Sequence, residues 1–378
     1  MIYNPKAIVS EAEAERIAEQ NEQEKAQGAD LLKPRLQTKL LADIEETDYP
    51  DLIFPVDGLI CEGATVLAGG SKIGKSWLAL QMCMAIAAGE PCLDRKTQKG
   101  KVLYLALEDS ERRLKSRAKH IRFKTGIRKE QYRENLEMLT KAPTVKDGLI
   151  DLLDTWLQDN KDARMICIDV MQKVRGITPG NRNAYQDDYA YLTTFQELSQ
   201  KHRVSILLLH HVNRRDDKSI GDPFDRISGS NGIMGTVDTA IILTKKRGQN
   251  NATAKIEGRD INSDDLVLNF DDGFWTLVSE DAQQHDAKQE YEKNPMVRLI
   301  KAIYADNPNG VYISTVDIMK ESLERFGQYI TQTPTETGTA IRKVAEELLL
   351  YDDIVIEARR TSGQRGYTIA RRMKMLHE

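Results

Sequence analysis

Residues 69–76, GGSKIGKS, match the phosphate-binding pattern GxxxxGKS. The apolar run ATVLA precedes them and WLALQMCMAIAAG follows, so the motif joins a predicted strand to a predicted helix. Its glycines let backbone amides turn toward a phosphate, Lys75 would reach the β and γ oxygens, and Ser76 would offer its hydroxyl to Mg²⁺. We therefore predict that the cofactors are ATP and Mg²⁺. The predicted nucleotide-binding residues are Gly69, Gly70, Ser71, Lys72, Ile73, Gly74, Lys75, Ser76 and Trp77.

Two carboxylates follow predicted strands and complete the chemistry that the phosphate-binding motif begins. Asp169 ends the run RMICID, where a carboxylate at the carboxyl edge of a sheet would hold magnesium through water. No glutamate follows Asp169, so the group that activates water must come from another strand. Glu108, at the end of KVLYLALED, fits that role. The alternative is that both are ordinary polar residues at strand ends.

Paired histidines end a third apolar run, VSILLLHH. A histidine there can donate a hydrogen bond to a phosphate oxygen or a bound water without becoming charged. We expect His210 to sense the γ-phosphate and His211 to point elsewhere. A metal site is the less favoured alternative, because no third ligand of suitable spacing is apparent.

The elements that must position these residues begin near Ile53, where short apolar runs alternate with helical stretches. This alternation is typical of parallel strands joined by crossover helices. It predicts an α/β fold with a twisted, mostly parallel sheet flanked by helices. The predicted buried strands cover residues 64–68, 102–106, 165–169, 204–210 and 239–244.

A different pattern follows the polar stretch 279–294, which we predict to be a linker. Three helical stretches, a short strand and the hairpin sequences IVIEARR and YTIARR predict a small winged helix-turn-helix domain. The predicted helices cover 297–304, 314–326 and 335–350, and the short strand covers 311–313. The predicted organisation is a polar N-terminal helix or arm at 1–48, an ATPase core at 49–278, the linker at 279–294 and the winged-helix domain at 295–378.

The composition excludes several classes of protein. With 54 basic and 58 acidic residues the net charge is −4, so a histone-like binder is excluded. The four cysteines form no CxxC pair, which argues against a zinc ribbon or a disulfide framework. No long apolar run or secretory signal is present, so we expect a cytoplasmic protein with no membrane partner.

Together these motifs resemble RecA-like ATPases, most closely the RepA-type hexameric replicative helicases related to DnaB. The resemblance covers roughly residues 50–278 and rests on GGSKIGKS, LYLALED, MICID, LLLHHVNR and SGSNGIMGTVDTAIIL. It implies a RecA-like fold and a homo-oligomeric, hexameric ring that acts on single-stranded DNA. It also implies that Glu108 is the catalytic base, Asp169 the magnesium carboxylate and His210 the nucleotide sensor.

The resemblance further implies which residues contact DNA. The long connection after His211 would face a central channel, where basic side chains and backbone donors meet the phosphate backbone; a solvated surface loop is the alternative. In the C-terminal unit, basic residues of the third helix and the wing would contact duplex DNA, although such domains also dock proteins. The predicted DNA-binding residues are Arg214, Arg215, Lys218, Ser230, Asn231, Arg342, Lys343, Arg359, Arg360 and Arg365.

RecA-like hexamers send a basic residue across the subunit boundary to the neighbour's γ-phosphate. Arg259 is the first candidate for this role in trans and Lys255 the second. Glu257 lies close to Arg259, which departs from the family's KxRxG pattern, and an ordinary surface role is the alternative for both cations.

The sequence thus favours an ATP-hydrolysing DNA motor, a helicase that acts in replication of a plasmid, phage or mobile element. The alternative is a DNA-binding regulator or partition-type switch in which ATP only controls assembly.

Overall fold

The computed structural model describes residues 16, 38–175, 184–212, 222–227, 230–246, 248–361 and 364–372. The chain divides into two compact units, Met1–Asp51 and Leu52–Glu378. Helix α2 (Leu41–Glu45) belongs to the first unit and is exposed along its whole length. Of the polar N-terminal helix or arm expected at 1–48, residues 1–15 and 17–37 lie outside the described residues, and Arg16 is helical.

The second unit contains a nine-stranded sheet in the order β3-β2-β4-β5-β1-β6-β7-β8-β9. Neighbouring strands are parallel from β3 to β6 and antiparallel from β6 to β9. The predicted α/β class with a mostly parallel sheet is therefore confirmed. The strands are β1 (Gly63–Gly69), β2 (Lys101–Ala106), β3 (Leu136–Leu139), β4 (Ala163–Asp169), β5 (Ser205–His211), β6 (Thr239–Thr244), β7 (Asn251–Gly258), β8 (Asp264–Asp271) and β9 (Phe274–Leu277).

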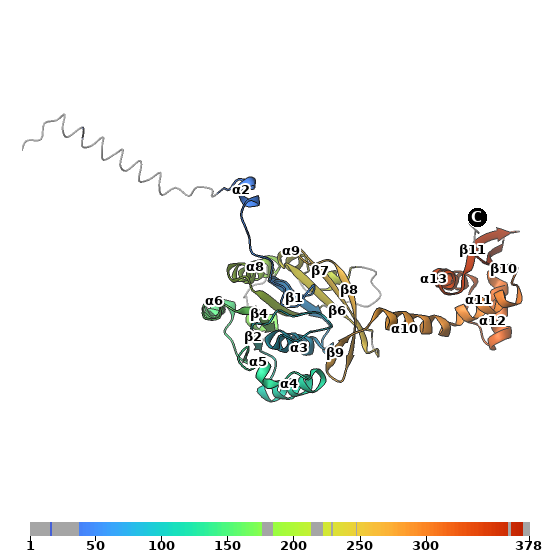
Figure 1. Cartoon of the computed structure of the whole chain (residues 1–378). Coiled ribbons are helices and arrows are strands. Elements are labelled where there is room, and N and C mark those ends of the chain that lie inside the picture. Colours follow the sequence, from blue (N-terminus) through green and yellow to red (C-terminus); the bar gives the residue numbers. More distant parts are fainter. Residues whose placement is uncertain are drawn as a thin grey trace, which may run out of the picture. The chain divides into compact units, whose positions relative to one another are not determined.

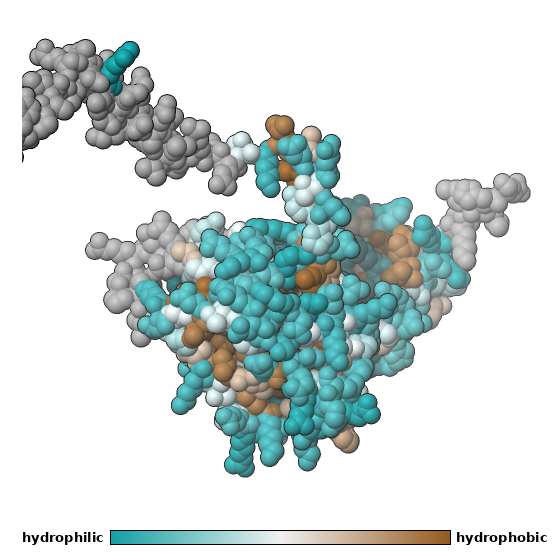
Figure 2. Space-filling model, turned by 60° about the vertical axis from the view of Figure 1, so that its left-hand side comes forward, coloured by the Kyte–Doolittle hydropathy of each residue, from teal (hydrophilic) through white to brown (hydrophobic). Residues whose placement is uncertain are grey.

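Helices cover both faces of this sheet (Figure 1). One hydrophobic cluster joins one face to α3, α4 and β9, and another joins the opposite face to α6, α7 and α8. In the space-filling view, hydrophilic residues cover most of the surface and hydrophobic ones form small patches (Figure 2). The helices are α3 (Lys75–Ala88), α4 (Glu111–Thr125), α5 (Lys129–Tyr132), α6 (Leu149–Asp159), α7 (Met171–Arg175), α8 (Ala184–His202) and α9 (Ser230–Thr236).

All five predicted strands are present, because each is a continuous apolar run buried on both faces. The sequence analysis missed β3, β7, β8 and β9. Half-buried and exposed residues alternate along β3, and buried and half-buried residues alternate along most of β7, so neither strand forms such a run. All four cysteines are free and buried, as expected for core thiols.

The C-terminal elements match the helices, strand and hairpin that the sequence predicts. Ser314 caps α12 by accepting a hydrogen bond from the backbone N–H of Asp317, and Gly327 ends it with φ 70°. A three-stranded antiparallel sheet in the order β10-β12-β11 packs with the helices around its own hydrophobic cluster. The elements are α10 (Glu280–Lys293), α11 (Pro295–Asp306), β10 (Val311–Ser314), α12 (Thr315–Phe326), α13 (Pro334–Asp352), β11 (Ile354–Thr361) and β12 (Gln364–Arg371).

Within the described ranges, none of the helices is both long and apolar enough to cross a membrane. The same residues contain no group of three His, Cys, Asp or Glu side chains placed to hold a metal ion.

We predict that a chain ending at Ser279 keeps a folded core around the nine-stranded sheet. The cluster around α11, α12 and α13 draws its buried residues from Tyr291 onward, whereas the two clusters of the large sheet end by Leu277. A segment that has a hydrophobic core of its own can fold without its neighbour. Thermal unfolding of the shortened chain should stay cooperative, and a loss of cooperativity would contradict the prediction.

Candidate nucleotide-binding site

The phosphate-binding loop follows β1 at the carboxyl edge of the sheet, between β5 and β6. Its first glycine has no room for a side chain, since a Cβ on Gly69 would lie 3.0 Å from the carbonyl oxygen of Leu243 on β6. Lys72 and Gly74 have φ angles of 61° and 108°, in the left-handed region. These conformations turn the loop tightly into the first turn of α3.

Lys75 is buried and folds back onto the loop that carries it. Its Nζ donates hydrogen bonds to the carbonyl oxygens of Gly69 (2.8 Å) and Gly70 (3.0 Å). Burial lowers the pKa of Lys75 to about 8, although the negative charges of Asp169 and Glu108 act in the opposite direction. The ammonium group thus lies within the turn where the β- and γ-phosphates of a nucleotide would bind.

Asp169, at the end of β4, is buried beside the first turn of α3. It accepts hydrogen bonds from the hydroxyl of Tyr104 on β2 (2.9 Å) and from the hydroxyl of Ser76. Burial raises the pKa of Asp169, and the two hydrogen bonds oppose that rise. A hydroxyl next to a carboxylate is the oxygen donor set that suits Mg²⁺, so Ser76 and Asp169 fit the predicted metal role.

Glu108 lies two residues beyond the end of β2 and is exposed. Its negative charge raises the pKa of both Lys75 and Asp169, so the three groups converge at one edge of the sheet. The adjacent Asp109 is held by Arg113 (3.0 Å) and Arg117 (2.5 Å) of α4. These ion pairs fix the turn that carries Glu108 and leave the glutamate itself open to solvent.

The paired histidines lie on opposite faces of β5. His211 has its Nδ1 3.4 Å from Nζ of Lys75, so the prediction that it points elsewhere is wrong. Alternate residues of a strand lie on the same face, so Leu207, Leu209 and His211 share one face of β5. Leu207 and Leu209 pack in the hydrophobic cluster that includes α3, which places His211 on the α3 side of the sheet. Burial, followed by the charge of Lys75, lowers the pKa of His211 and favours its neutral form.

His210 is buried on the other face, where its Nδ1 lies 2.8 Å from the side-chain amide nitrogen of Gln172 on α7. Because β5 is hydrogen-bonded to both β1 and β4, His210 lies between the phosphate-binding loop and the segment that follows Asp169.

Residues 33–217 match a family model described as an AAA domain. The matched range contains the phosphate-binding loop, Glu108, Asp169 and both histidines. The core to which this match belongs has a mostly parallel α/β sheet with a phosphate-binding loop between β1 and α3. A solved structure of an ATPase domain is similar over 58% of this chain and 85% of that chain, with 14% sequence identity and a TM-score of 0.45. None of the curated proteins compared matches the chain.

The sequence analysis missed the support that β9 gives to the phosphate-binding loop, residues 69–76, which we call the P-loop. The indole N–H of Trp275 donates a hydrogen bond to the carbonyl oxygen of Gly74 (3.0 Å). The backbone N–H and carbonyl oxygen of Trp275 bond with the side-chain amide of Gln81 on α3, at 3.1 Å and 2.9 Å. A single glutamine within an apolar helical run was the signal available, because a buried amide needs partners.

Trp77, predicted to contact the nucleotide, packs between α4 and the turn before β9. The guanidinium of Arg117 lies 5.1 Å from the centre of its ring, and the His120 ring meets it edge-on at 5.8 Å. Gly273 leaves space for this ring, since a Cβ there would lie 2.9 Å from it. The indole thus ties α4 to the first turn of α3.

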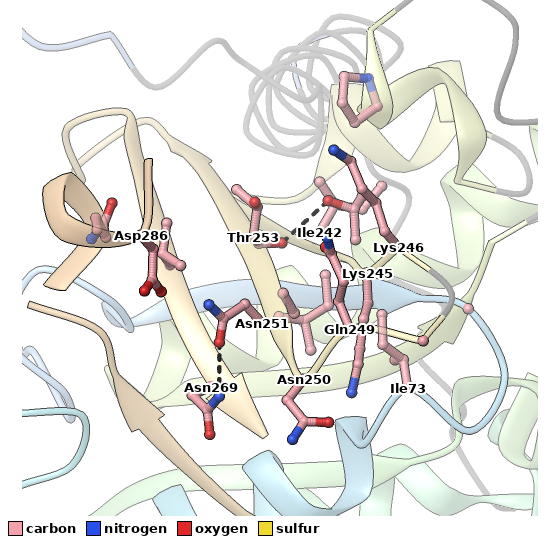
Figure 3. Close-up of a pocket in the computed structure, with 18 of the residues that line it drawn as sticks. Ile73, Ile242, Lys245, Lys246, Gln249, Asn250, Asn251, Thr253, Asn269 and Asp286 are labelled. Carbon is pink, nitrogen blue, oxygen red and sulfur yellow. Dashed lines mark hydrogen bonds between the residues drawn. The ribbon is translucent and has the colours of Figure 1, made fainter. Parts of the chain in front are cut away.

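A cleft of about 1380 Å³ opens beside the P-loop, over β6 and β7 (Figure 3). Gly70 and Ile73 of the loop line it together with Lys245 and Lys246. Side-chain amides make up much of the rest of its wall, and Asn269 donates a hydrogen bond to Asn251 (2.7 Å). Residues of α10, among them Asp286 and Lys293, complete the wall, whereas Lys75, Glu108 and Asp169 do not line this cleft.

The two cations predicted to act in trans are paired with carboxylates of their own chain. Arg259 donates hydrogen bonds to Asp238 (3.2 Å) and to the carbonyl oxygen of Gly235 (3.2 Å). It follows β7 at the amino edge of β1 and β6, opposite the P-loop. Lys255 pairs with Asp265 on β8 (3.0 Å).

Of the predicted DNA-binding residues, those after His211 lie outside the described part of the chain, namely Arg214, Arg215 and Lys218. Ser230 and Asn231 begin α9, and their side chains are also outside the description. The remaining five are exposed, on α13 and on the β11–β12 hairpin, and they are Arg342, Lys343, Arg359, Arg360 and Arg365.

We predict that nucleotide affinity falls with rising pH. Lys75 must be protonated to bind phosphate, and its pKa in the free protein is about 8. Above that pH the neutral amine dominates, so the dissociation constant should rise roughly tenfold per pH unit. Titration of a fluorescent ATP analogue at about pH 7.5 and about pH 9.5, on either side of that pKa, measures this. The Lys75→Met variant should bind weakly at both values, and a flat wild-type profile would contradict the lowered pKa.

We predict that Gly74→Ala damages the P-loop more than a comparable glycine substitution elsewhere. A Cβ on Gly74 would lie 2.9 Å from the Trp275 ring, in addition to the strain of a positive φ. Gly126→Ala is the matched control, because Gly126 has φ 74° and no atom within 4 Å of that Cβ. Urea unfolding should show a loss of about 1 kcal/mol for Gly126→Ala and clearly more for Gly74→Ala. Only Gly74→Ala should also weaken nucleotide binding, and equal losses in both variants would contradict the Trp275 contact.

Proposed function

We propose that this protein is an oligomeric, ATP-hydrolysing DNA motor, a helicase that acts in the replication of a plasmid, phage or mobile element. The observation that carries the proposal is the convergence of Glu108, Lys75 and Asp169 at the P-loop. A protein that only binds ATP needs the lysine and the metal site. A carboxylate open to solvent in the same place adds the group that hydrolysis requires.

The proposed chemistry assigns one task to each side chain. Lys75 would exchange the carbonyl oxygens of Gly69 and Gly70 for phosphate oxygens, which stabilises the negative charge of the transition state. Ser76 and Asp169 would hold Mg²⁺, which when bound neutralises phosphate charge. Glu108 would orient a water molecule and accept its proton as it attacks the γ-phosphate.

The proposed coupling to DNA runs through β5. His210 contacts Gln172 on α7, and His211 contacts Lys75, so one strand end meets both the P-loop and the segment after Asp169. The residues predicted to contact single-stranded DNA follow His211 directly in the sequence. Loss of the γ-phosphate would therefore move the end of β5, and with it the DNA-contacting residues that follow this strand.

Residues 295–378 are proposed to form a winged-helix domain that binds duplex DNA. Arg360 on β11 lies directly opposite Arg365 on β12, and both are exposed. Like charges in directly opposed positions repel one another, and a bound phosphate would relieve that repulsion. This pair is the support for a DNA role over a protein-docking role.

The ring and the trans role of Arg259 are part of the proposal. Closed rings form by head-to-tail contacts, so the edge of one subunit that carries Arg259 would face the neighbour's P-loop. To reach a γ-phosphate, the guanidinium would leave Asp238, an exchange of one anion for another. Lys255 would act as the secondary cation after leaving Asp265.

The direct test is the ATPase rate, with and without single-stranded DNA, for wild type, Glu108→Gln and Glu111→Gln. Glu108→Gln should bind ATP normally and lose about 100-fold or more in turnover, because an amide cannot accept the proton. Glu111→Gln, which removes an exposed carboxylate three residues away, should behave as wild type. Absence of DNA-stimulated hydrolysis in the wild type would overturn the motor and favour the ATP-controlled regulator.

The shared site is tested in the same assay by mixing variants. Arg259→Ala alone should hydrolyse ATP slowly, and a mixture with Glu108→Gln should recover part of the activity, since some interfaces then pair an intact P-loop with an intact arginine. Solution mass with ATP should show an oligomer. A monomer under these conditions, with no recovery on mixing, would contradict a site built by two subunits.

A further inference from the structure

Helix α4 carries more positive charge than its place beside the P-loop explains. Its sequence, ERRLKSRAKHIRFKT, contains seven lysines and arginines and one glutamate. Only Leu114 and Ile121 are buried, so the helix packs on the core along a narrow line. It lies on the outside of the core, beyond α3 (Figure 1).

One flank of α4 is already occupied by carboxylates of the same chain. Arg113 and Arg117 bond to Asp109, and His120 (3.5 Å) and Lys124 (3.4 Å) approach Asp272 in the turn before β9. These contacts account for three of the seven lysines and arginines and for the one histidine of the helix. Arg117 also lies over the ring of Trp77 in the first turn of α3, so this flank of α4 holds the helix beside the phosphate-binding loop.

The outward face of α4 has no such partners. Arg112, Lys115 and Lys119 are exposed, and none of them forms an ion pair with a carboxylate of the described residues. At about 100° per residue they fall, with Phe123, in a sector of about 80° on the side opposite Leu114 and Ile121. The side chain of Phe123 is 84% exposed. We call these four residues the α4 stripe.

We propose that the α4 stripe binds a strand of single-stranded DNA on the outer surface of the core. The stripe spans about 16 Å along the helix, which matches several consecutive phosphates at roughly 3.4 Å each along a stacked strand. A cation track with an exposed aromatic ring is the combination that holds an unpaired strand, because the ring stacks on a base. An acidic protein surface would satisfy the cations and leave Phe123 without a function.

This site goes beyond the proposed motor and does not depend on hydrolysis. The helix that carries the stripe is capped by Ser110, two residues after Glu108, and Arg113 and Arg117 fix the intervening Asp109. A strand bound on the outer face would therefore be attached, through one rigid helix, to the turn that carries the proposed catalytic base.

The test measures binding of a fluorescent oligothymidylate to the full-length protein over a range of salt concentrations, without ATP. The variant Arg112→Gln/Lys115→Gln/Lys119→Gln removes the stripe cations, and Phe123→Ala removes the ring. The control Lys129→Gln/Lys146→Gln/Lys161→Gln removes the same charge from exposed lysines outside α4.

Loss of three phosphate contacts should reduce the slope of log affinity against log salt by about 2, whereas the control should keep the wild-type slope. Phe123→Ala should weaken binding by roughly fivefold or more with an unchanged slope. Equal slopes for the stripe and control variants would overturn the proposal. A change of solution mass with unchanged oligonucleotide affinity would also overturn it, and would assign the stripe to contacts between copies of the chain. Failure of the ATPase test would leave this result unaffected.

Discussion

The site depends on how the chain holds one buried cation, Lys75, before any phosphate arrives. The carbonyl oxygens of Gly69 and Gly70 accept its hydrogen bonds, so the loop solvates its own lysine. A buried ammonium without partners would cost several kcal/mol or lose its proton. The tight turn with its left-handed residues, Lys72 and Gly74, returns the chain so that those oxygens reach the amine.

The surrounding sheet supplies each further group from a separate strand end. β2 leads to Glu108, β4 ends in Asp169, and β5 ends in the two histidines, all at the carboxyl edge that carries the loop. In an open parallel sheet, strands that are far apart in the sequence all end at this edge. Side chains from distant parts of the chain can therefore act on one ligand there. The antiparallel strands contribute in a different way, because Trp275 on β9 braces the loop from outside the parallel part of the sheet.

The local part of this arrangement was predictable from the sequence. The strand, loop and helix around Lys75 are contiguous, and Asp169 and Glu108 follow continuous apolar runs of the kind that predicts a buried strand. The prediction that His211 points away from the site was wrong, although the alternation of side chains along β5 places His211 on the same face as Leu207 and Leu209. The bonds between Gln81 and Trp275 and between Arg259 and Asp238 join residues whose pairing depends on sheet order, which no local pattern contains.

The bracing of the loop by β9 also gives the protein an optical reporter of its own. The chain has three tryptophans. The indole of Trp275 donates a hydrogen bond to the loop at Gly74, and Trp77 lies in the first turn of α3, two residues after Lys75. The third, Trp156, donates a hydrogen bond to Glu137 on β3. Indole emission responds to the polarity and hydrogen bonding of the ring. Two of the three emitters therefore record the state of the loop, and ligand occupancy becomes readable without any attached dye.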